Sequence, residues 1–463
     1  MDRLARLSFP AALLAAGIAV RAVQAHGVLL YPDAYQYLLM ARGIAEHLRP
    51  TIQLGAGGEH WVPNADAALK PLFPALIALL HAFGVGWTSA ARVISVVAGG
   101  TAAALCGLLG ARLSGSRWLG AAATGLVLFD PLTRYWAAFS SPDSLGMALA
   151  LGSGLLVLSK RPRLAGIAGG LAAFGRPELG LMLLAGAAVL AVRPRHRTEA
   201  LAYLTSAMAA DAVVLAVLRP PLSSHPLQVA VAVAAAAAAA AFALHAPPVA
   251  GCAAGLVGLI AADEHGQALA HFATHDAAVA VPGLVGIVLA RKTRAAAVLA
   301  VAVACLALVY DYKNGGNTRY VSLLVPLAAV AAAAGAGTVR IRPAVVLAGA
   351  AAVVIAAFTA RTPLPGPDMF RTIAGQLPHT SRPIVTAADD AYGFVLYPRP
   401  VKALAAGAQG LILDDATARV YEPELAVDGR IVRRIDPGEG FQRPNGTIDT
   451  DPALLIDGKV RPR

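Results

Sequence analysis

The chain has 463 residues, of which 57% are hydrophobic and only 14% are charged, and its formal net charge is +11. Soluble domains carry roughly 25% charged residues, so the composition excludes an ordinary soluble protein. The basic residues form short clusters at the ends of long apolar blocks, a pattern typical of membrane topology and not of a nucleic-acid-binding surface. Cys106, Cys252 and Cys305 lie inside apolar blocks without metal-ligand spacing, so we expect no disulfide framework.

The first apolar block predicts a membrane helix over about residues 8–28. Arg3 and Arg6 precede it, and its end near Ala25 loosely resembles the cleavage site of a signal peptide. We favour an uncleaved anchor, because the residues that follow carry candidate functional groups. The next stretch, about 29–87, is then a long outer loop.

Segment 71–84 within this loop is apolar but too short to span a bilayer. Counting it as a span would place Asp143 in the cytoplasm and the Arg112/Arg117 loop outside. We therefore predict an interfacial helix here, lying along the membrane surface.

The basic clusters predict the sidedness of the remaining helices, because Lys and Arg collect in cytoplasmic loops. They occur at Arg112/Arg117, Lys160–Arg163, Arg193–Arg197, Arg291–Arg294 and Arg340/Arg342. This threading predicts a polytopic α-helical protein of a bacterial cytoplasmic membrane. We expect about 13 spans in residues 1–360, among them about 88–112 and about 117–137, and an outer C-terminus. The inner loop of the 226–262 hairpin contains no Lys or Arg.

Residues 361–463 predict a small α/β domain outside the membrane, since Gly, Pro and charge rise and short alternating runs appear. The runs are Pro383–Val385, Leu411–Leu413 and Leu454–Ile456. Asp428-Gly429 and Asp457-Gly458 predict hairpin turns. No glycine-rich nucleotide loop precedes a helix, so no nucleotide site is expected.

Ionisable residues on the predicted outer side are the first candidates for chemistry, because charge near a bilayer is costly. Asp33 follows the first helix beside Tyr35 and Tyr37, and a carboxylate there can accept a proton from a hydroxyl. The alternative is an ordinary loop acid. Asp143 begins a predicted helix after Ser141-Pro142, where an acid can also serve only to stabilise the helix N-terminus.

Three cations are candidates for binding a phosphate. Lys70 precedes the interfacial segment and can hold a phosphate as a point charge or merely snorkel. Arg176 lies beside Glu178, so phosphate binding and an ion pair with Glu178 both stay open. Arg319, followed by Tyr320, lies too far from the cytoplasmic side to be a topology signal and suits a lipid phosphate.

Histidines also lie on or near the outer side. We expect His60 to contribute to a substrate pocket with Tyr35, Tyr37, Glu178 and Tyr320. His271 and His275 are spaced i, i+4 before Asp276, a spacing that can bind zinc on a helix. Without a clear third ligand we expect no metal site and no required cofactor, and leave a divalent metal open.

The candidates occur in a characteristic order: Asp33, Lys70-Pro71-Leu72-Phe73-Pro74, Ala91–Ser95, Ser141–Asp143, Gly175–Glu178, and Arg319-Tyr320 with Pro326. Over about residues 1–340 this series resembles the GT-C glycosyltransferase superfamily. It is most similar to the protein O-mannosyltransferases and the lipid A aminoarabinose transferase.

The resemblance implies an inverting hexosyl- or pentosyltransferase that acts on the outer face of the membrane. It would move a sugar from a polyprenyl-phosphate carrier to a hydroxyl of a glycan, glycolipid or protein, with membrane lipids as further partners and no nucleic acid. Asp33 would be the catalytic base and Asp143 the second acid. Lys70, Arg176 and Arg319 would hold the donor phosphate.

The chain departs from these relatives at two motifs. Leu72 follows Pro71 where the relatives commonly carry a second proline, and Ala34 follows Asp33 where several carry a second acid. The sugar and the acceptor therefore stay open, and we expect the C-terminal domain to help shape the acceptor site. The alternatives are a secondary transporter, although no convincing inverted repeat is present, and an inactive scaffold of envelope assembly.

Overall fold

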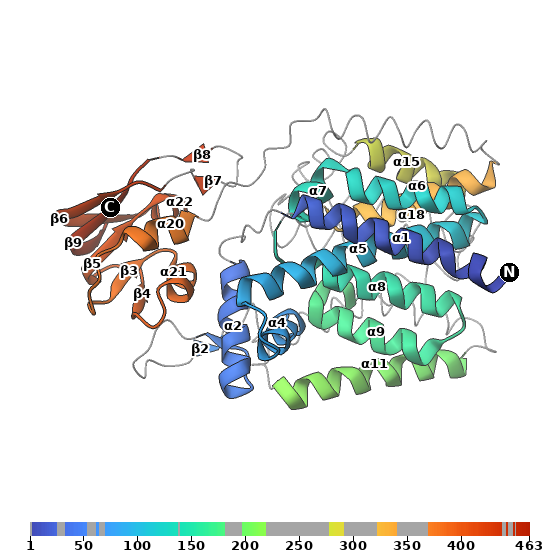
Figure 1. Ribbon diagram of the computed structural model, residues 1–463, viewed down its shortest axis with the longest axis horizontal. Helices are drawn as coiled ribbons and strands as arrows, with labels where there is room; N and C mark the ends of the chain where they lie inside the picture. Colours follow the sequence, from blue (N-terminus) through green and yellow to red (C-terminus); the bar gives the residue numbers. More distant parts are fainter. Residues whose placement is uncertain are drawn as a thin grey trace.

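The protein is elongated, with a helical body at one end and a mixed sheet at the other (Figure 1). The structure is a computed structural model, and it describes residues 2–25, 33–52, 62–63, 70–137, 139–180, 197–218, 277–290, 322–339, 369–437, 441–442, 448–449 and 451–463. The helical body comprises the described residues up to 339, and the C-terminal domain begins at Met369.

Helices dominate the body, as the apolar blocks predict. The described helices are α1 (Asp2–Gln24), α2 (Asp33–His47), α4 (Leu72–Ala82), α5 (Trp87–Ser114), α6 (Arg117–Phe129), α7 (Pro131–Ala137), α8 (Asp143–Leu158), α9 (Pro162–Gly175), the 3-10 turn η1 (Pro177–Leu179), α11 (Arg197–Leu218), α15 (Ala277–Leu289) and α18 (Val325–Thr338). Two short strands, β1 (Thr51–Ile52) and β2 (Val62–Pro63), pair antiparallel beside α2.

Length and composition make α5 the one helix among the described residues that could cross a membrane. Shorter apolar helices include α4, α6, α8 and the segment Leu324–Thr338. Much of the chain beyond residue 180, where most of the later spans were expected, lies outside the described residues. The count of about 13 spans therefore stays a prediction.

The span expected over 117–137 is interrupted. Helix α6 ends at Phe129 and α7 begins at Pro131, with Asp130 between them. The Asp130 carboxylate accepts a hydrogen bond of 2.9 Å from the backbone N–H of Thr133, and proline is favourable at the first position of a helix. The sequence prediction of one continuous helix was wrong, because Asp130 and Pro131 together start a new one.

Glycines bring the helices of the body into close contact. A Cβ on Gly17 of α1 would lie 2.5 Å from the carbonyl oxygen of Gly100 in α5. A Cβ on Gly335 of α18 would lie 2.3 Å from the Cα of Gly286 in α15. Backbones that approach this closely associate by van der Waals packing, the mode that small residues provide in lipid.

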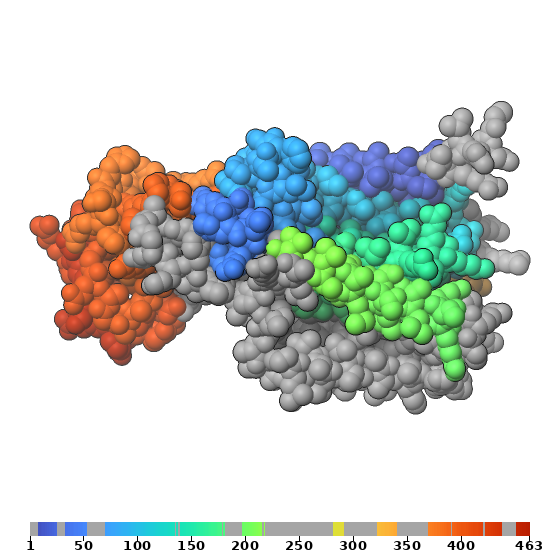
Figure 2. Space-filling view, turned by 90° about the horizontal axis from the view of Figure 1, so that it is seen from below, coloured from blue at the N-terminus to red at the C-terminus, as the bar shows by residue number. Residues whose placement is uncertain are grey.

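Large apolar side chains face outward from the body. Trp118 of α6 is 54% exposed, and Leu201 and Met208 of α11 are 64% and 69% exposed. Figure 2 shows α11, in light green, along the surface of the body. Extended apolar surface of this kind marks contact with a membrane or a partner.

The two ends of the helical body differ in charge. The connection from α5 to α6 carries Arg112 and Arg117, the connection from α8 to α9 carries Lys160–Arg163, and α11 begins at Arg197. All three lie at the end of the body away from the C-terminal domain (Figure 1). Helices α8 and α4 begin at the opposite end, which therefore carries Asp143 and Lys70.

The C-terminal domain is built on a five-stranded sheet of order β4-β3-β5-β9-β6. Its strands are β3 (Ile384–Thr386), β4 (Val401–Ala403), β5 (Gln409–Asp414), β6 (Leu425–Ile435) and β9 (Ala453–Pro462), with helices α20 (Met369–Gln376), α21 (Asp389–Val395) and α22 (Ala416–Tyr421). Strand β3 is parallel to β4 and β5, whereas β9 is antiparallel to β5 and β6. A further pair, β7 (Phe441–Gln442) and β8 (Ile448–Asp449), is antiparallel.

The strands expected at Ile384-Val385, Leu411–Leu413 and Leu454–Ile456 are present as parts of β3, β5 and β9. The two Asp-Gly pairs are not turns. Gly429 of β6 lies directly opposite Gly458 of β9, in the middle of both strands. A Cβ on Gly458 would lie 2.0 Å from the carbonyl oxygen of Asp428. The prediction of hairpin turns was wrong because these glycines permit close approach of paired strands.

Candidate active site

The sequence candidates Asp143 and Arg176 meet inside the helical body. The Arg176 Nε lies 3.1 Å from the Asp143 Oδ1, and the two side chains are 0% and 10% exposed. Asp143 is the first residue of α8, and Arg176 follows the last residue of α9. Away from water the two charges attract each other more strongly than at a surface, but burying them costs solvation, so removing either partner is strongly destabilising.

Two glycines make this approach possible. A Cβ on Gly175 would lie 2.9 Å from the Cα of Gly146 in α8, and a Cβ on Gly146 would lie 3.2 Å from the Cγ of Arg176. Helices α8 and α9 therefore cross almost without side chains between them. The sequence left open an ion pair between Arg176 and Glu178, but Arg176 pairs with Asp143, and the Glu178 side chain lies outside the described residues.

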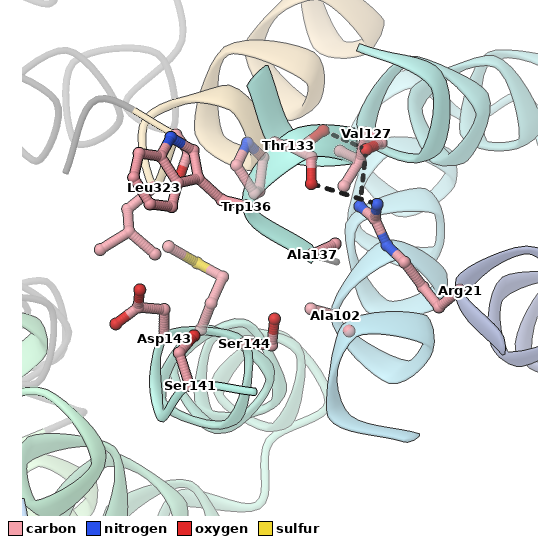
Figure 3. A pocket seen from close by; sticks show the side chains of 14 residues that line it. Arg21, Ala102, Val127, Thr133, Trp136, Ala137, Ser141, Asp143, Ser144 and Leu323 are labelled. Atoms are coloured by element: carbon pink, nitrogen blue, oxygen red, sulfur yellow. Dashed lines mark hydrogen bonds between the residues drawn. The ribbon is translucent and has the colours of Figure 1, made fainter. Parts of the chain in front are cut away.

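A cavity of about 50 Å³ with a mixed polar and apolar lining lies beside this ion pair, next to the start of α8. Its lining includes Arg21, Thr133, Trp136, Ser141, Asp143 and Ser322. Figure 3 shows Asp143, Ser141 and Ser144 on one side of the cavity, with Arg21 and Trp136 across from them. Since a water needs at least about 10–15 Å³ by this measure, the cavity accommodates a few waters or a small polar group.

Arg21 is a charged residue that the sequence prediction missed. It lies in the last turn of α1 and is 3% exposed. Its guanidinium donates hydrogen bonds to the carbonyl oxygens of Val127 at 2.9 Å and Thr133 at 3.3 Å, and to the side chain of Gln24 at 2.7 Å. An arginine inside an apolar helix is the signal that could have identified it.

The contacts of Arg21 join α1 to the break between α6 and α7. The side chain of Gln24 donates a hydrogen bond of 2.9 Å to the carbonyl oxygen of Leu128 in the same region. Asp130, which starts α7, is fully buried and is an electrostatic partner of Arg21. Among the residues that the structure describes, this part of the body buries the cations Arg21 and Arg176 near the acids Asp130 and Asp143.

Helix α5 fixes the loop that precedes Asp143. The backbone N–H of Ser141 donates a hydrogen bond of 3.1 Å to the Ser95 hydroxyl, which donates to the Ser141 carbonyl oxygen at 3.3 Å. Arg92, one turn earlier on α5, donates to the carbonyl oxygen of Ala25. The Ala91–Ser95 motif of the sequence thus holds two segments of the site in place.

Asp33 and Lys70 lie in neighbouring elements. Asp33 is the first residue of α2 and not, as expected, a loop residue, and its side chain is partly exposed. Lys70 is 9% exposed just before α4. One turn into α2, the ring of Tyr37 packs edge-on against Phe73 in the first turn of α4, with 5.7 Å between ring centroids. The starts of the two helices therefore lie close together.

Tyr35 and Tyr37, expected to line a substrate pocket, are core residues. They are 0% and 2% exposed and belong to a cluster that joins α2, α4 and the start of α5 to the C-terminal domain. Their role in a substrate pocket stays a prediction. The aromatic rings after Asp33 are on a helix packed on two sides, so they stabilise contacts between elements and do not line the cavity beside Asp143.

Several candidates lie outside the described residues: His60, Arg319, Tyr320, His271, His275 and Asp276. The segment described next after Tyr320 begins at Ser322, which is buried and lines the cavity. Within the described part of the chain, no group of three or more His, Cys, Asp or Glu side chains is arranged to hold a metal ion.

No protein-family model matches the chain, and no curated protein matches it. Solved structures of ArnT from Cupriavidus metallidurans do match. The structure bound to undecaprenyl phosphate is 14% identical, covers 96% of this chain and 97% of its own, and gives a TM-score of 0.41. The apo structure is also 14% identical, covers 97% and 98%, and gives a TM-score of 0.40.

The chain is similar to ArnT over nearly its whole length. ArnT is the lipid A aminoarabinose transferase, one of the GT-C enzymes that the motif series resembles. At 14% identity and a TM-score near 0.4, this likeness by itself establishes neither the fold nor the activity of the chain.

Proposed function

We propose that the chain is an inverting glycosyltransferase of the GT-C type. It would move a sugar from a polyprenyl-phosphate carrier to a hydroxyl acceptor on the outer face of the cytoplasmic membrane. The observation that carries the proposal is a cavity lined by Asp143 and Arg21, with Arg176 paired to Asp143, inside a body with apolar outer surfaces. Buried charge in such a body is costly and marks a functional site.

The sidedness of the charges supports the outer face. The basic connections at Arg112/Arg117 and Lys160–Arg163 lie at the end of the body opposite to the start of α8, where Asp143 lies. Under the positive-inside rule, that end faces the cytoplasm. Asp143, Lys70 and the C-terminal domain then face outward, where a lipid-linked donor is presented.

The chemistry needs a base, a donor site and stabilisation of the leaving group. Asp33 takes the proton from the acceptor hydroxyl, whose oxygen attacks the anomeric carbon from the side opposite the phosphate. The bond between that carbon and the phosphate oxygen breaks, and the polyprenyl phosphate leaves with the bonding electrons. Lys70 and Arg319 stabilise its negative charge.

In this mechanism, Arg176 acts first on Asp143 and not on the donor phosphate. Its Nε lies 3.1 Å from the Asp143 Oδ1, so its positive charge favours the ionised form of that carboxylate at the start of α8. Its assignment as a ligand of the donor phosphate stays a prediction, as does the role of Asp143 as the second acid.

The test is consumption of a panel of undecaprenyl-phosphate sugars by the purified protein. Undecaprenyl phosphate is the lipid bound in one ArnT structure and is the carrier to test first. Asp33→Asn should lower turnover by about 10²–10⁴-fold if Asp33 is a general base. Asp428→Asn is the matched control, because Asp428 is 54% exposed and pairs with Arg461 in the C-terminal domain.

Full activity in Asp33→Asn would remove the base assignment and leave the transferase in place. If the folded wild type consumes no donor, the transferase proposal fails. Movement of a solute in vesicles would then identify a transporter, and the absence of both activities would favour an envelope-assembly scaffold.

A further inference from the structure

The C-terminal domain packs directly on the helix that begins with Asp33. Tyr35 of α2 is fully buried between Phe370 of α20 and Phe394 of α21. The centroid of its ring lies 5.4 Å from that of Phe370 and 6.1 Å from that of Phe394. The contact with Phe370 is edge-on, at an interplanar angle of 80°. Aromatic pairs in this geometry stabilise a contact by more than the burial of their surface area alone.

A second contact lies two turns further along α2. The guanidinium carbon of Arg42 is 4.0 Å from the ring centroid of Tyr397 and 5.0 Å from that of Phe394. Arg42 is 9% exposed, and burial lowers its pKa from the ordinary arginine value. Within the described part of the chain, its buried Nη1 has no hydrogen-bond acceptor. The rings of the C-terminal domain face this cation, and Glu46, one turn further along α2, also interacts with it electrostatically.

The two contacts lie on one face of α2. Tyr35 and Arg42 are seven residues apart, which is two helical turns. Tyr37 contacts α4 through Phe73, so α2 is packed between α4 and the C-terminal domain. A helix of 15 residues is only marginally stable alone in water. Its position depends on these two packed faces.

The contacts extend into the centre of the C-terminal domain. Phe370 packs edge-on against Tyr392, with 5.4 Å between centroids, and the Tyr392 hydroxyl donates a hydrogen bond of 2.9 Å to Asp415. Asp415 in turn accepts a hydrogen bond of 2.9 Å from the backbone N–H of Thr417 at the start of α22. The residues that contact α2 thus belong to the buried core of the C-terminal domain.

We propose that the C-terminal domain positions the catalytic base, because its aromatic residues hold Tyr35 and Arg42 and so fix the helix whose first residue is Asp33. This inference rests on the proposed transferase function. It assigns Arg42, Tyr35 and Phe394 as positioning residues that act on the reaction through α2. It differs from a role of the domain in acceptor binding, which would change the acceptor KM and leave kcat unaltered.

The experiment uses the full chain with Arg42→Met, Phe394→Leu and the double variant. Arg42→Met removes the cation and keeps most of the side-chain volume, and Phe394→Leu keeps an apolar side chain, so both variants are chosen to fold. Arg42→Lys retains a cation near the rings. Arg382→Ala is the matched control, since Arg382 is exposed and pairs with Asp457 on the surface of the same domain.

Two readouts are taken from each variant. Steady-state kinetics should show kcat lowered by about 10²-fold in the double variant, because a misplacement near 1 Å can cost that much, with KM for donor and acceptor little changed. Amide hydrogen exchange across α2 should become faster in the same variants. Arg42→Lys should recover part of both effects, and Arg382→Ala should match the wild type.

Unchanged kcat and unchanged exchange in the double variant would overturn the proposal. A raised acceptor KM with unaltered kcat would also overturn it, and would assign the domain to acceptor binding. Exchange needs no turnover, which separates this inference from the proposed function. In a further outcome, the wild type consumes no donor while amide exchange across α2 is still faster in the double variant. That result would support the packing of the C-terminal domain on α2 and refute the catalytic role of Asp33.

Discussion

In the helical body, Leu201 and Met208 of α11 point outward, whereas Asp143 and Arg176 pair inside. In the C-terminal domain the arrangement is reversed: Ile412 and Leu413 of β5 are 0% exposed, and Arg382 pairs with Asp457 on the surface. The second pattern is that of a protein surrounded by water. The first suits a body whose outer surface contacts lipid and whose functional charges face inward.

This difference implies that the same type of interaction has different energies in the two regions. An ion pair enclosed in the body must satisfy both of its charges, because neither can be hydrated. An ion pair on the surface of the C-terminal domain competes with water and is weak. The following changes test this comparison.

The largest effect is expected for Arg176→Met. It leaves the Asp143 carboxylate buried without the guanidinium that is 3.1 Å away, and removing one partner of a buried pair costs about 3–5 kcal/mol. Thermal unfolding in detergent or nanodiscs measures the loss. The double variant Asp143→Leu/Arg176→Met should be more stable than Arg176→Met alone. Equal stability of the two variants would show that Asp143 finds another partner.

Gly458→Ala tests packing within the C-terminal domain. The added Cβ would lie 2.0 Å from the Asp428 carbonyl oxygen, so β6 and β9 must separate. Overpacking of this kind costs about 1–3 kcal/mol. Gly375→Ala in α20 is the control, because a Cβ there meets nothing within 4 Å and alanine favours a helix by roughly 1 kcal/mol. A destabilisation of the same size in both variants would contradict the close approach of the strands.

Arg21→Met sharpens the comparison within the body. It removes the donors that serve the carbonyl oxygens of Val127 and Thr133. The Val127 oxygen keeps the Thr133 hydroxyl as a donor, so the cost is that of the lost hydrogen bonds from a charged donor, about 1–3 kcal/mol. Arg21→Lys should lose less, since an ammonium still donates. Thermal unfolding measures the stability of both variants. If Arg21→Met is as stable as the wild type, the contacts of Arg21 do not stabilise the connection between α6 and α7.

The smallest effect is expected for Arg382→Ala on the surface. Arg382 lowers the pKa of the Asp457 carboxyl by hydrogen bonding and by its charge. A carboxyl whose folded pKa lies below its unfolded value of about 3.9 adds stability above that pH, and this is lost as the pH falls through the folded pKa. Wild type and Arg382→Ala should therefore differ slightly at neutral pH and converge in acid. A difference that persists in acid would point to lost packing instead of charge.

Much of the organisation follows from local sequence patterns. The apolar block at about residues 88–112 predicted α5, the short apolar segment at 71–84 predicted the helix α4, and three alternating runs predicted β3, β5 and β9. The sequence also singled out Asp143 and Arg176. These features depend on neighbours a few residues apart, and periodicity or a breaker such as Pro131 is written in the chain itself.

The tertiary structure decided which of these residues meet. Arg176 binds Asp143 because Gly146 and Gly175 let α8 and α9 touch, and Arg21 reaches Val127 across 106 positions of the chain. Tyr35 became a core residue because a domain more than 300 positions later packs on α2. Asp428-Gly429 became strand and not turn because Gly458 lies opposite. Such contacts depend on distances between elements, and no local pattern contains those distances.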